Sequence, residues 1–349
     1  MIISRTPYRI SFFGGGTDYP AWYKEYGGRI LATTIDKYCY ISTRYLPPFF
    51  KHNSRILYSK IEEVNSVDEI RHPAVREILK YFHIHEGVEI HHDGDLPARS
   101  GIGSSSAFTV GLLHTLFALK EKMVAKIHLA KEAIRIEQHI LKENVGCQDQ
   151  VSAAFGGFNR VDFAPNDEIS IVPIILSQER LNALQDHLLL YFTGISRTAS
   201  EIAKEQIKKT KEKKRELTLM REMVDESISI LTGTQDMGAF GRLLHEHWMI
   251  KRSLSKNISS NVIDQIYEKA RNAGAIGGKI LGAGGGGFML LFAHPKDHAK
   301  IKEKLSNLLR VSFRFENMGS QIIFYHPNIL IEAGNIFNRN AQERFKLRV

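Results

Sequence analysis

Residues 96–107 combine two spaced glycines with three consecutive serines, directly before an apolar segment. This pattern predicts a loop that runs into a buried helix over residues 104–120. Such a junction directs unpaired backbone N–H groups and the positive end of the helix dipole at one point. A phosphate chain fits there, so the segment is typical of a nucleotide-phosphate site. The candidate residues are Gly101, Gly103, Ser104, Ser105 and Ser106.

This loop differs from the Walker A motif, because no Gly-Lys-Ser or Gly-Lys-Thr follows four residues after a glycine. The simpler alternative is an ordinary serine cap, since serine is favoured at the start of a helix. Three serines exceed what one cap requires, so phosphate binding is the hypothesis that we carry forward.

Glu137 interrupts an otherwise apolar stripe on the helix predicted over residues 127–142, where it joins Ala130, Ile134 and Leu141. A carboxylate on such a stripe is costly unless it is paired or binds a cation. One alternative is a lysine or arginine across the core. The other is a role as ligand to Mg²⁺, which takes oxygen donors and usually one or two carboxylates together with phosphates.

Asp149 lies just beyond the predicted end of that helix, before a run of small residues. An aspartate in a turn commonly accepts hydrogen bonds from the backbone. Beside a phosphate site it could instead take a proton from a substrate hydroxyl. The residues alone leave both interpretations open.

Residues 282–287 form a second glycine-rich segment, which formally matches G-x-G-x-x-G. A dinucleotide-binding fold requires a following helix, whereas a strand-like apolar run follows here over residues 288–292. The segment therefore predicts a tight loop whose backbone closely approaches another chain segment or a ligand. Its candidate positions are Gly282, Gly284, Gly285 and Gly286.

The bulk properties are those of an ordinary globular protein of 349 residues, of which 43% are hydrophobic and 24% charged. No apolar run is long enough to span a bilayer and the start lacks signal-peptide features, so we expect a cytoplasmic protein. The two cysteines cannot build a disulfide framework or a zinc cluster by themselves. The net charge of +9 is compatible with nucleic acid or small polyanions. The densest basic run, residues 204–215, lacks aromatics and is interpreted as a solvated helix face.

The periodicity of the chain mixes strands and helices without a repeating βαβ unit. Strands are predicted over residues 2–13, 29–45, 87–92, 155–161, 169–175, 188–192 and 321–325. Helices are predicted over residues 104–120, 127–142, 199–231, 237–254, 260–273 and 298–309. We therefore expect an α+β protein of two domains, residues 1–185 and 186–349.

Three motifs in this order cover nearly the whole chain: Thr6-Pro7-Tyr8-Arg9 with Gly14-Gly15-Gly16-Thr17-Asp18-Tyr19, residues 97–107, and residues 279–287. Together they resemble the GHMP kinase superfamily, which includes galactokinase, homoserine kinase, mevalonate kinase and phosphomevalonate kinase. Within it, the chain is most similar to the D-glycero-D-manno-heptose 7-phosphate kinases. The resemblance implies an N-terminal ATP-binding domain like ribosomal protein S5 and a ferredoxin-like C-terminal domain.

The resemblance also implies ATP as co-substrate and Mg²⁺ as cofactor. The glycines and serines of residues 101–106 would wrap the ATP phosphates. Ser105 and Glu137 would be the Mg²⁺ ligands, which would explain a carboxylate on an apolar stripe. Asp149 would face the acceptor hydroxyl, and Arg9 would lie beside that aspartate.

A substrate-binding segment is implied near the start of the chain. Asp18 matches the sugar-binding aspartate of galactokinases, and Gly15, Gly16 and Thr17 precede it. Galactokinases have Glu-His where this chain has Gly15 and Gly16. The loss of two bulky polar side chains widens the sugar pocket, which favours a sugar larger than galactose.

The phosphate of such a substrate requires cations. Arg197 belongs to a looser match with a substrate-lining segment of the second domain, residues 193–198. Further candidates are Arg99, Arg29 and Lys37.

The implied reaction phosphorylates the anomeric C1 hydroxyl of D-glycero-D-manno-heptose 7-phosphate to the 1,7-bisphosphate, for nucleotide-activated heptose and surface polysaccharide. Another kinase of the superfamily, similar to fucokinase, galactokinase or mevalonate kinase, is the alternative. A non-catalytic nucleic-acid-binding protein with an S5-like fold is the alternative from another class. Glu137 and Asp149 argue against it, because a polyanion binder gains nothing from acidic groups in its anion site. We expect small-molecule substrates, no nucleic-acid or membrane partner, and a monomer or homodimer.

Overall fold

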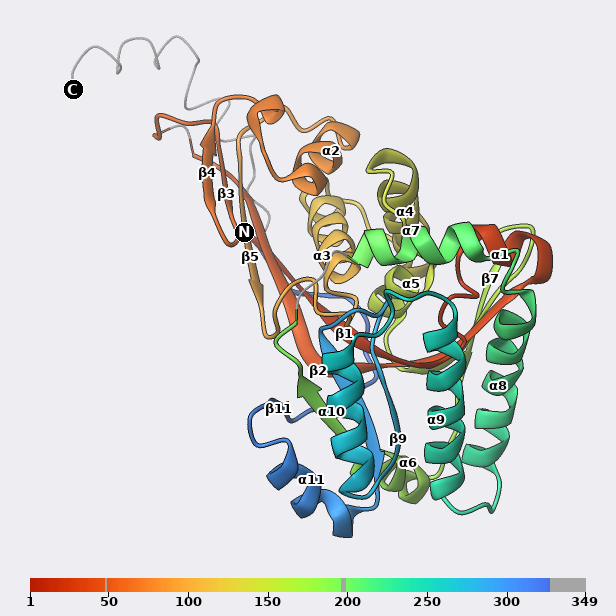
Figure 1. Ribbon diagram of the computed structural model, residues 1–349. Helices are drawn as coiled ribbons and strands as arrows, with labels where there is room; N and C mark the ends of the chain where they lie inside the picture. Colours follow the sequence, from red (N-terminus) through yellow and green to blue (C-terminus); the bar gives the residue numbers. More distant parts are fainter. Residues whose placement is uncertain (48, 196–198, 327–349) are drawn as a thin grey trace.

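A computed structural model describes residues 1–47, 49–195 and 199–326. Two long antiparallel strands, β1 (Ile2–Phe13) and β2 (Gly28–Tyr45), form the centre of its larger sheet (Figure 1). From Thr6 onward every residue of β1 is buried, because helices of both halves of the chain pack against it. This strand therefore lies at the heart of the molecule.

Within the described residues the larger sheet has nine strands, with a main path β13-β1-β2-β5-β3-β4. In addition, β6 pairs with β2 and β7, and β12 pairs with β2. The remaining strands of this sheet are β3 (Ser54–Leu57), β4 (Ile61–Val64), β5 (Val88–Gly94), β6 (Phe158–Phe163), β7 (Ile169–Pro173), β12 (Phe315–Glu316) and β13 (Gln321–Tyr325).

The helix α3 (Ser104–Leu119) is apolar nearly all round and is buried against β1 and β2. Its neighbours are α4 (Lys126–Arg135) and α5 (Gln148–Phe155). Two short helices, α1 (Pro20–Tyr26) and α2 (Pro73–Tyr81), each begin at a proline, which suits the first helical position.

A second antiparallel sheet, in the order β11-β8-β10-β9, is the centre of the other half of the chain. Its strands are β8 (Leu188–Phe192), β9 (Ala275–Ile280), β10 (Phe288–Ala293) and β11 (Leu309–Val311). Its helices are α6 (Gln178–Asp186), α7 (Ala199–Lys209), α8 (Lys214–Thr232), α9 (Gly238–Ser253), α10 (Asn261–Asn272) and α11 (His298–Lys304). Both α9 and α10 pack against β9. None of the helices in the described part of the chain could cross a membrane.

The expected α+β class is confirmed, but two helix predictions need correction. The helix predicted over residues 127–142 is α-helical only to Arg135 and continues as a π-helical turn, η2 (Ile136–Ile140). The helix predicted over residues 199–231 is two helices, α7 and α8, with a break at residues 210–213.

Other boundaries differ because short elements were overlooked. The strand predicted over residues 155–161 begins only at Phe158, since α5 occupies the preceding segment. The helix predicted over residues 298–309 ends at Lys304, and Leu309 already belongs to β11. The helices α1, α2 and α6, of seven to nine residues, and the strands β3 and β4, of four residues each, were not predicted.

The division into residues 1–185 and 186–349 stays a prediction. The chain crosses that division again, because β12 and β13 return to the larger sheet. There β12 pairs with β2, and β13 pairs with β1.

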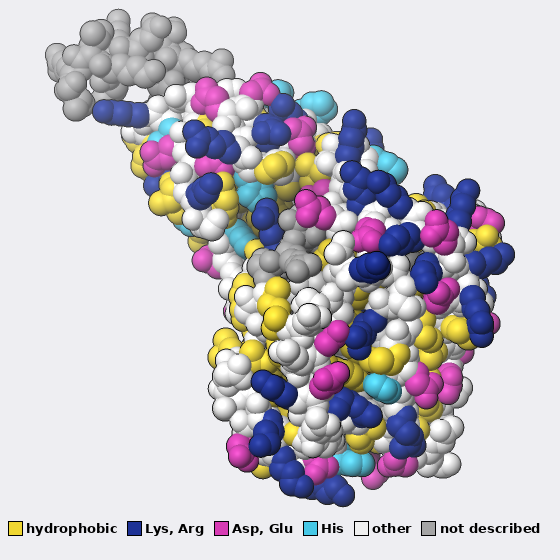
Figure 2. Space-filling view, viewed as in Figure 1, with side chains coloured by type: hydrophobic (Ala, Val, Ile, Leu, Met, Phe, Trp, Pro, Cys, Tyr) yellow, Lys and Arg dark blue, Asp and Glu magenta, His cyan; other side chains and the backbone are white. Residues whose placement is uncertain are grey.

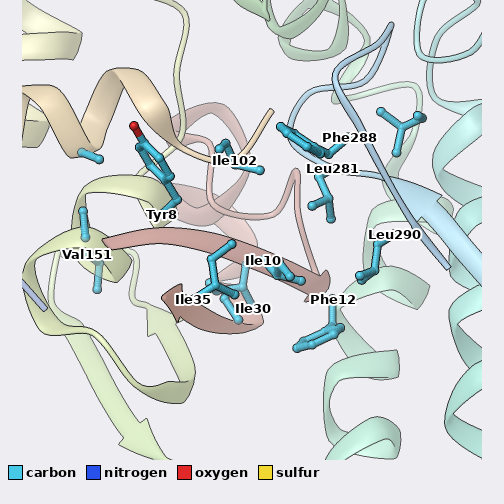
Figure 3. Close-up of a cluster of buried hydrophobic side chains, with 14 of the residues drawn as sticks. Tyr8, Ile10, Phe12, Ile30, Ile35, Ile102, Val151, Leu281, Phe288 and Leu290 are labelled. Atoms are coloured by element: carbon cyan, nitrogen blue, oxygen red, sulfur yellow. The ribbon is translucent and has the colours of Figure 1, made fainter. Parts of the chain in front are cut away.

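One apolar cluster joins the two halves (Figure 3). Phe12 of β1 meets Phe240 of α9 edge-on, with the ring centroids 5.5 Å apart. Phe288 of β10 belongs to the same cluster. Beside it, the buried Lys279 Nζ donates hydrogen bonds to the carbonyls of Ser11 at 3.0 Å and Phe12 at 2.8 Å. The second half of the chain is therefore anchored on β1 by apolar and polar contacts.

The two glycine-rich loops stack backbone to backbone. Gly101 and Gly282 have φ angles of 81° and 70°, in the left-handed region that favours glycine. A Cβ on Gly282 would lie 2.7 Å from the Gly101 Cα. The Phe288 N–H donates to the Ser100 carbonyl at 3.1 Å, so β10 also holds the first loop. The loop of residues 282–287 was predicted to approach another chain segment or a ligand. The structure shows that it packs against the loop that contains Gly101.

We expect Gly282→Ala to destabilise the protein more than Gly194→Ala. Both positions have a positive φ, which costs alanine about 1–2 kcal/mol. Among the described residues only Gly282 adds a steric clash, since a Cβ on Gly194 meets none of them within 4 Å. Urea unfolding of both variants measures the difference. An equal loss of unfolding free energy in the two variants would show that the two glycine-rich loops do not constrain each other.

Candidate active site

A cavity of about 260 Å³ lies where the two glycine-rich loops meet β1 and α5. Its lining brings together predicted residues from the beginning, the middle and the end of the chain. They are Arg9, Gly15, Gly16, Asp18, Gly101, Gly103, Ser104, Ser105, Ser106, Asp149 and Gly282.

The first glycine-rich loop, residues 96–103, is called the phosphate-type loop. It enters α3 at the predicted position, Ser104. The residue that precedes the helix is Gly103, with a φ of 73°, so no serine side chain caps this end. The Ser104 hydroxyl instead accepts a hydrogen bond from the Arg99 N–H at 3.1 Å. The first-turn N–H groups of α3 have no acceptor within the helix and remain available to an anion in the cavity.

Glu137 is fully buried at the π-helical turn η2. Its Oε2 accepts hydrogen bonds from the Ser106 hydroxyl at 2.9 Å and from the Gln150 side-chain amide, whereas its Oε1 has no hydrogen-bond partner in the described part of the chain. No lysine or arginine pairs with it among the described residues, so the alternative of a basic partner across the core is not met. Burial raises the pKa of Glu137 to about 7.

Glu137 does not itself line the cavity but bonds to Ser106, which does, so together they would suit a divalent cation completed by nucleotide oxygens. The unpaired Oε1 of Glu137 is an orphaned acceptor, which a cation would satisfy. Ser105 lines the cavity, but the hydroxyl that contacts Glu137 belongs to Ser106. The described residues include no cluster of three His, Cys, Asp or Glu side chains for a metal. The remaining ligands would therefore be phosphate and water oxygens.

Arg9 and Asp149 form a two-pronged ion pair at the cavity. Arg9 Nε donates to Asp149 Oδ1 and Nη2 donates to Oδ2, each at 2.8 Å. Arg9 Nη1 also donates to the Gly101 carbonyl at 2.6 Å. Asp149 lies in the first turn of α5, not in the turn expected from the sequence, and its carboxylate bonds to a guanidinium. The pair fixes the plane of the carboxylate beside the phosphate-type loop.

The segment of Gly15, Gly16 and Asp18 forms another wall of the cavity. The Asp18 carboxylate accepts hydrogen bonds from the N–H groups of Gly16 at 2.9 Å and Gln148 at 3.3 Å. Burial raises the pKa of Asp18, and these backbone hydrogen bonds partly offset the effect. Thr17 does not line the cavity, because its hydroxyl turns away toward backbone carbonyls.

The residues predicted to bind the substrate phosphate do not all lie at the same cavity. Arg99 lines the cavity. Arg29 forms ion pairs with Asp162 and Asp225 at a different cavity, and Lys37 lies at a third. Arg197 lies outside the described residues.

Sequence reasoning missed three charged residues of the lining: Glu143, Lys251 and Lys279. Lys251 of α9 is buried, and its Nζ donates to the Gly282 carbonyl at 2.5 Å. Burial lowers the pKa of Lys251 to about 8. A detectable signal existed, since Lys251 follows Leu244 and Trp248 on an apolar stripe, the same anomaly that marked Glu137.

The basic run at residues 204–215 lies on α7, the following turn and the start of α8, mostly exposed or partly exposed. Ion pairs join Lys209 to Glu205 and Lys213 to Glu216. On the face in Figure 2, lysine and arginine side chains are interspersed with acidic ones. The run is therefore a solvated helix face, as predicted.

Two family models match this chain. The GHMP kinase N-terminal domain matches residues 69–157, and the GHMP kinase C-terminal domain matches residues 226–311. The chain belongs to the GHMP kinase family. As a GHMP kinase, it is an ATP-dependent phosphotransferase that acts on an alcohol group.

Named relatives of this GHMP kinase include sugar kinases. D-glycero-alpha-D-manno-heptose 7-phosphate kinase of Campylobacter jejuni is 28% identical over 310 residues, which cover 84% of this chain and 90% of the relative. Galactokinase of Thermotoga maritima is 25% identical over 351 residues, covering 92% and 96%. A D-glycero-D-manno-heptose 1-phosphate kinase structure from Bacteroides thetaiotaomicron matches 93% of this chain and all of that chain, with a TM-score of 0.74 and 24% identity. The two-domain GHMP kinase fold expected from the sequence is thereby confirmed.

We expect Glu137→Gln to stabilise the ligand-free protein at alkaline pH. Because burial raises the pKa of Glu137 from 4.5 to about 7, wild-type stability falls as pH rises through this interval. At about 1.4 kcal/mol per pKa unit, the variant would gain up to about 3 kcal/mol above the interval and nothing below it. Thermal unfolding in EDTA at about pH 4.5 and about pH 8 measures the effect, with the exposed Glu212→Gln as control. A pH-independent difference would contradict the assignment.

Proposed function

We propose that this kinase transfers the γ-phosphoryl group of ATP to the anomeric C1 hydroxyl of D-glycero-D-manno-heptose 7-phosphate, giving the 1,7-bisphosphate. The observation that carries the proposal is the Arg9–Asp149 pair in the same cavity as the first turn of α3. A phosphoryl donor and a hydroxyl acceptor can therefore meet there. The Campylobacter jejuni relative named for this substrate supports the choice of acceptor. The product would supply nucleotide-activated heptose for surface polysaccharide.

In this proposal the N-terminal turn of α3 binds the triphosphate. Free N–H groups at Ser104, Ser105 and Ser106 and the helix dipole offset its negative charge. Glu137 and the neighbouring serine hydroxyls would hold Mg²⁺, which when bound supplies charge neutralisation at the phosphates. Phosphoryl transfer depends on alignment and charge stabilisation more than on covalent chemistry. The main contribution of the loop is therefore to hold the triphosphate in position for transfer.

Asp149 orients the acceptor in this proposal. Its side chain is 27% exposed although Arg9 holds both oxygens, so lone pairs remain accessible from the cavity. The acceptor hydroxyl would donate to one of them. As the new O–P bond forms and the bond to the β-phosphate bridging oxygen breaks, the hydroxyl proton passes to Asp149.

The room beside Asp149 suits a large sugar phosphate. The atoms nearest to a Cβ on Gly15 would be side-chain atoms of Gln148 and Ser11, at 3.6 and 3.7 Å, so a side chain there would take space from the acceptor. Asp18 offers a buried carboxylate to a sugar hydroxyl from the same wall. Of the predicted cations that the structure describes, Arg99 is the one at this cavity for a phosphate group.

An acceptor screen tests the proposed substrate. With ATP and Mg²⁺, we expect kcat/KM for the heptose 7-phosphate to exceed that for galactose, fucose or mevalonate by at least about tenfold, or about 1.4 kcal/mol in transition-state stabilisation. Phosphorus NMR of the product should show a phosphate on the anomeric carbon. Faster turnover of galactose, fucose or mevalonate would replace the heptose assignment by the corresponding alternative.

We expect Asp149→Asn to lower kcat by about 100-fold or more, the range of a lost acid–base group. ATP binding should survive, because the phosphate-type loop is unchanged. Coupled turnover and ATP titration calorimetry provide the measurements. Asp162→Asn is a matched control, because Asp162 also pairs with an arginine but lies away from the cavity. Wild-type turnover in Asp149→Asn would refute the role of this carboxylate.

A further inference from the structure

Lys251 is a charged group of the cavity to which the proposed chemistry assigns no role. It comes from α9, in the half of the chain opposite the phosphate-type loop, and it is only 4% exposed. Among the described residues its ammonium group donates one hydrogen bond, to the Gly282 carbonyl. An ammonium group has three N–H donors, so two remain for a group that enters the cavity.

Two neighbouring cations of the cavity, Arg9 and Lys279, already donate to other groups, and Arg99 is a further cation of the lining. Arg9 binds both carboxylate oxygens of Asp149 and a backbone carbonyl. Lys279 donates to two backbone carbonyls of β1. By contrast, no ion pair joins Lys251 to Asp18 or Asp149 within the described structure, although both carboxylates line the same cavity. A buried cation that no carboxylate contacts directly is costly, so this group is suited to an incoming anion.

The position of Lys251 indicates which part of an incoming nucleotide its ammonium group would contact. Its hydrogen-bond acceptor, Gly282, stacks on Gly101 of the phosphate-type loop. The Gly101 carbonyl in turn binds Arg9, which holds Asp149. The ammonium group therefore lies at the junction between the loop that binds the donor and the carboxylate that faces the acceptor. In the proposed reaction the γ-phosphoryl group passes through this junction.

We propose that Lys251 is a catalytic residue that donates hydrogen bonds to the oxygens of the phosphoryl group during its transfer. This inference rests on the proposed function of the cavity. The acceptor O–P bond forms, the bond to the bridging oxygen of ADP breaks, and the acceptor proton passes to Asp149. Lys251 keeps its proton throughout and stabilises charge on the equatorial oxygens.

The protonation of Lys251 provides a readout that a structural role would not give. Burial and Arg9 lower its pKa to about 8, while Asp18 and Asp149 oppose that shift. Lys279 of β9 is the further basic group of the lining that packs on this side. The charged form of Lys251 is lost as pH rises through about 8, so kcat/KM for ATP should decline there. Arginine stays protonated, so Lys251→Arg should lose this decline.

The test compares Lys251→Met, Lys251→Arg and the exposed control Lys256→Met. We expect Lys251→Met to lower kcat by about 100-fold, the effect of removing one donor to developing charge. KM for ATP and Tm should stay near the wild-type values. Lys251→Arg should recover part of kcat and show the altered pH profile, and Lys256→Met should match the wild type.

Two outcomes would overturn the inference. One is a kcat of Lys251→Met within about threefold of the wild type. The other is a loss of kcat together with a raised ATP KM and a lower Tm that Lys251→Arg does not restore, which would mean that Lys251 only supports the Gly282 loop. All variants are assayed with the acceptor that the wild type turns over fastest. Failure of the heptose assignment therefore leaves this test intact.

Discussion

The guanidinium group of Arg9 is the point on which the geometry of the active site depends. This planar group extends from β1, donates two hydrogen bonds to the carboxylate of Asp149 on α5 and donates a third to the carbonyl of Gly101. Gly103 makes this approach feasible, because a Cβ there would lie 3.2 Å from Arg9 Cγ. Lysine could not replace this group, since an ammonium group lacks its planar, bidentate geometry. The guanidinium group of Arg9 thus connects β1, the phosphate-type loop and α5.

Much of the site could be predicted because its signals are local. The glycines and serines before α3 lie next to one another in sequence, and a carboxylate on an apolar stripe marks Glu137 without any knowledge of the fold. The order of three such motifs along the chain then carried the family resemblance, which supplied the expected roles of the residues. The π-helical turn around Glu137 was missed, because a single widened turn leaves the hydrophobic period almost unchanged.

The contribution of the second half of the chain could not be predicted from local patterns. Lys251 and Lys279 reach the cavity, and His247 reaches the loop after β1, only because α9 packs against β1 and Lys279 of β9 bonds to its carbonyls. His247 illustrates the point: its Nε2 accepts the N–H of Gly14 at 3.2 Å, a contact between residues 233 positions apart. Periodicity shows that such a residue faces inward, but it does not show which segment the residue meets.

The return of β13 to the larger sheet has a consequence for how the protein is made. β1 is synthesised long before β13, which comes some 300 residues later in the chain and pairs with Ile2–Arg5 on the edge of β1 opposite β2. Until then the outer edge of β1 presents unpaired N–H and C=O groups, the feature that promotes strand-to-strand association between chains. The nascent chain therefore passes through a long interval in which its central strand is an open edge.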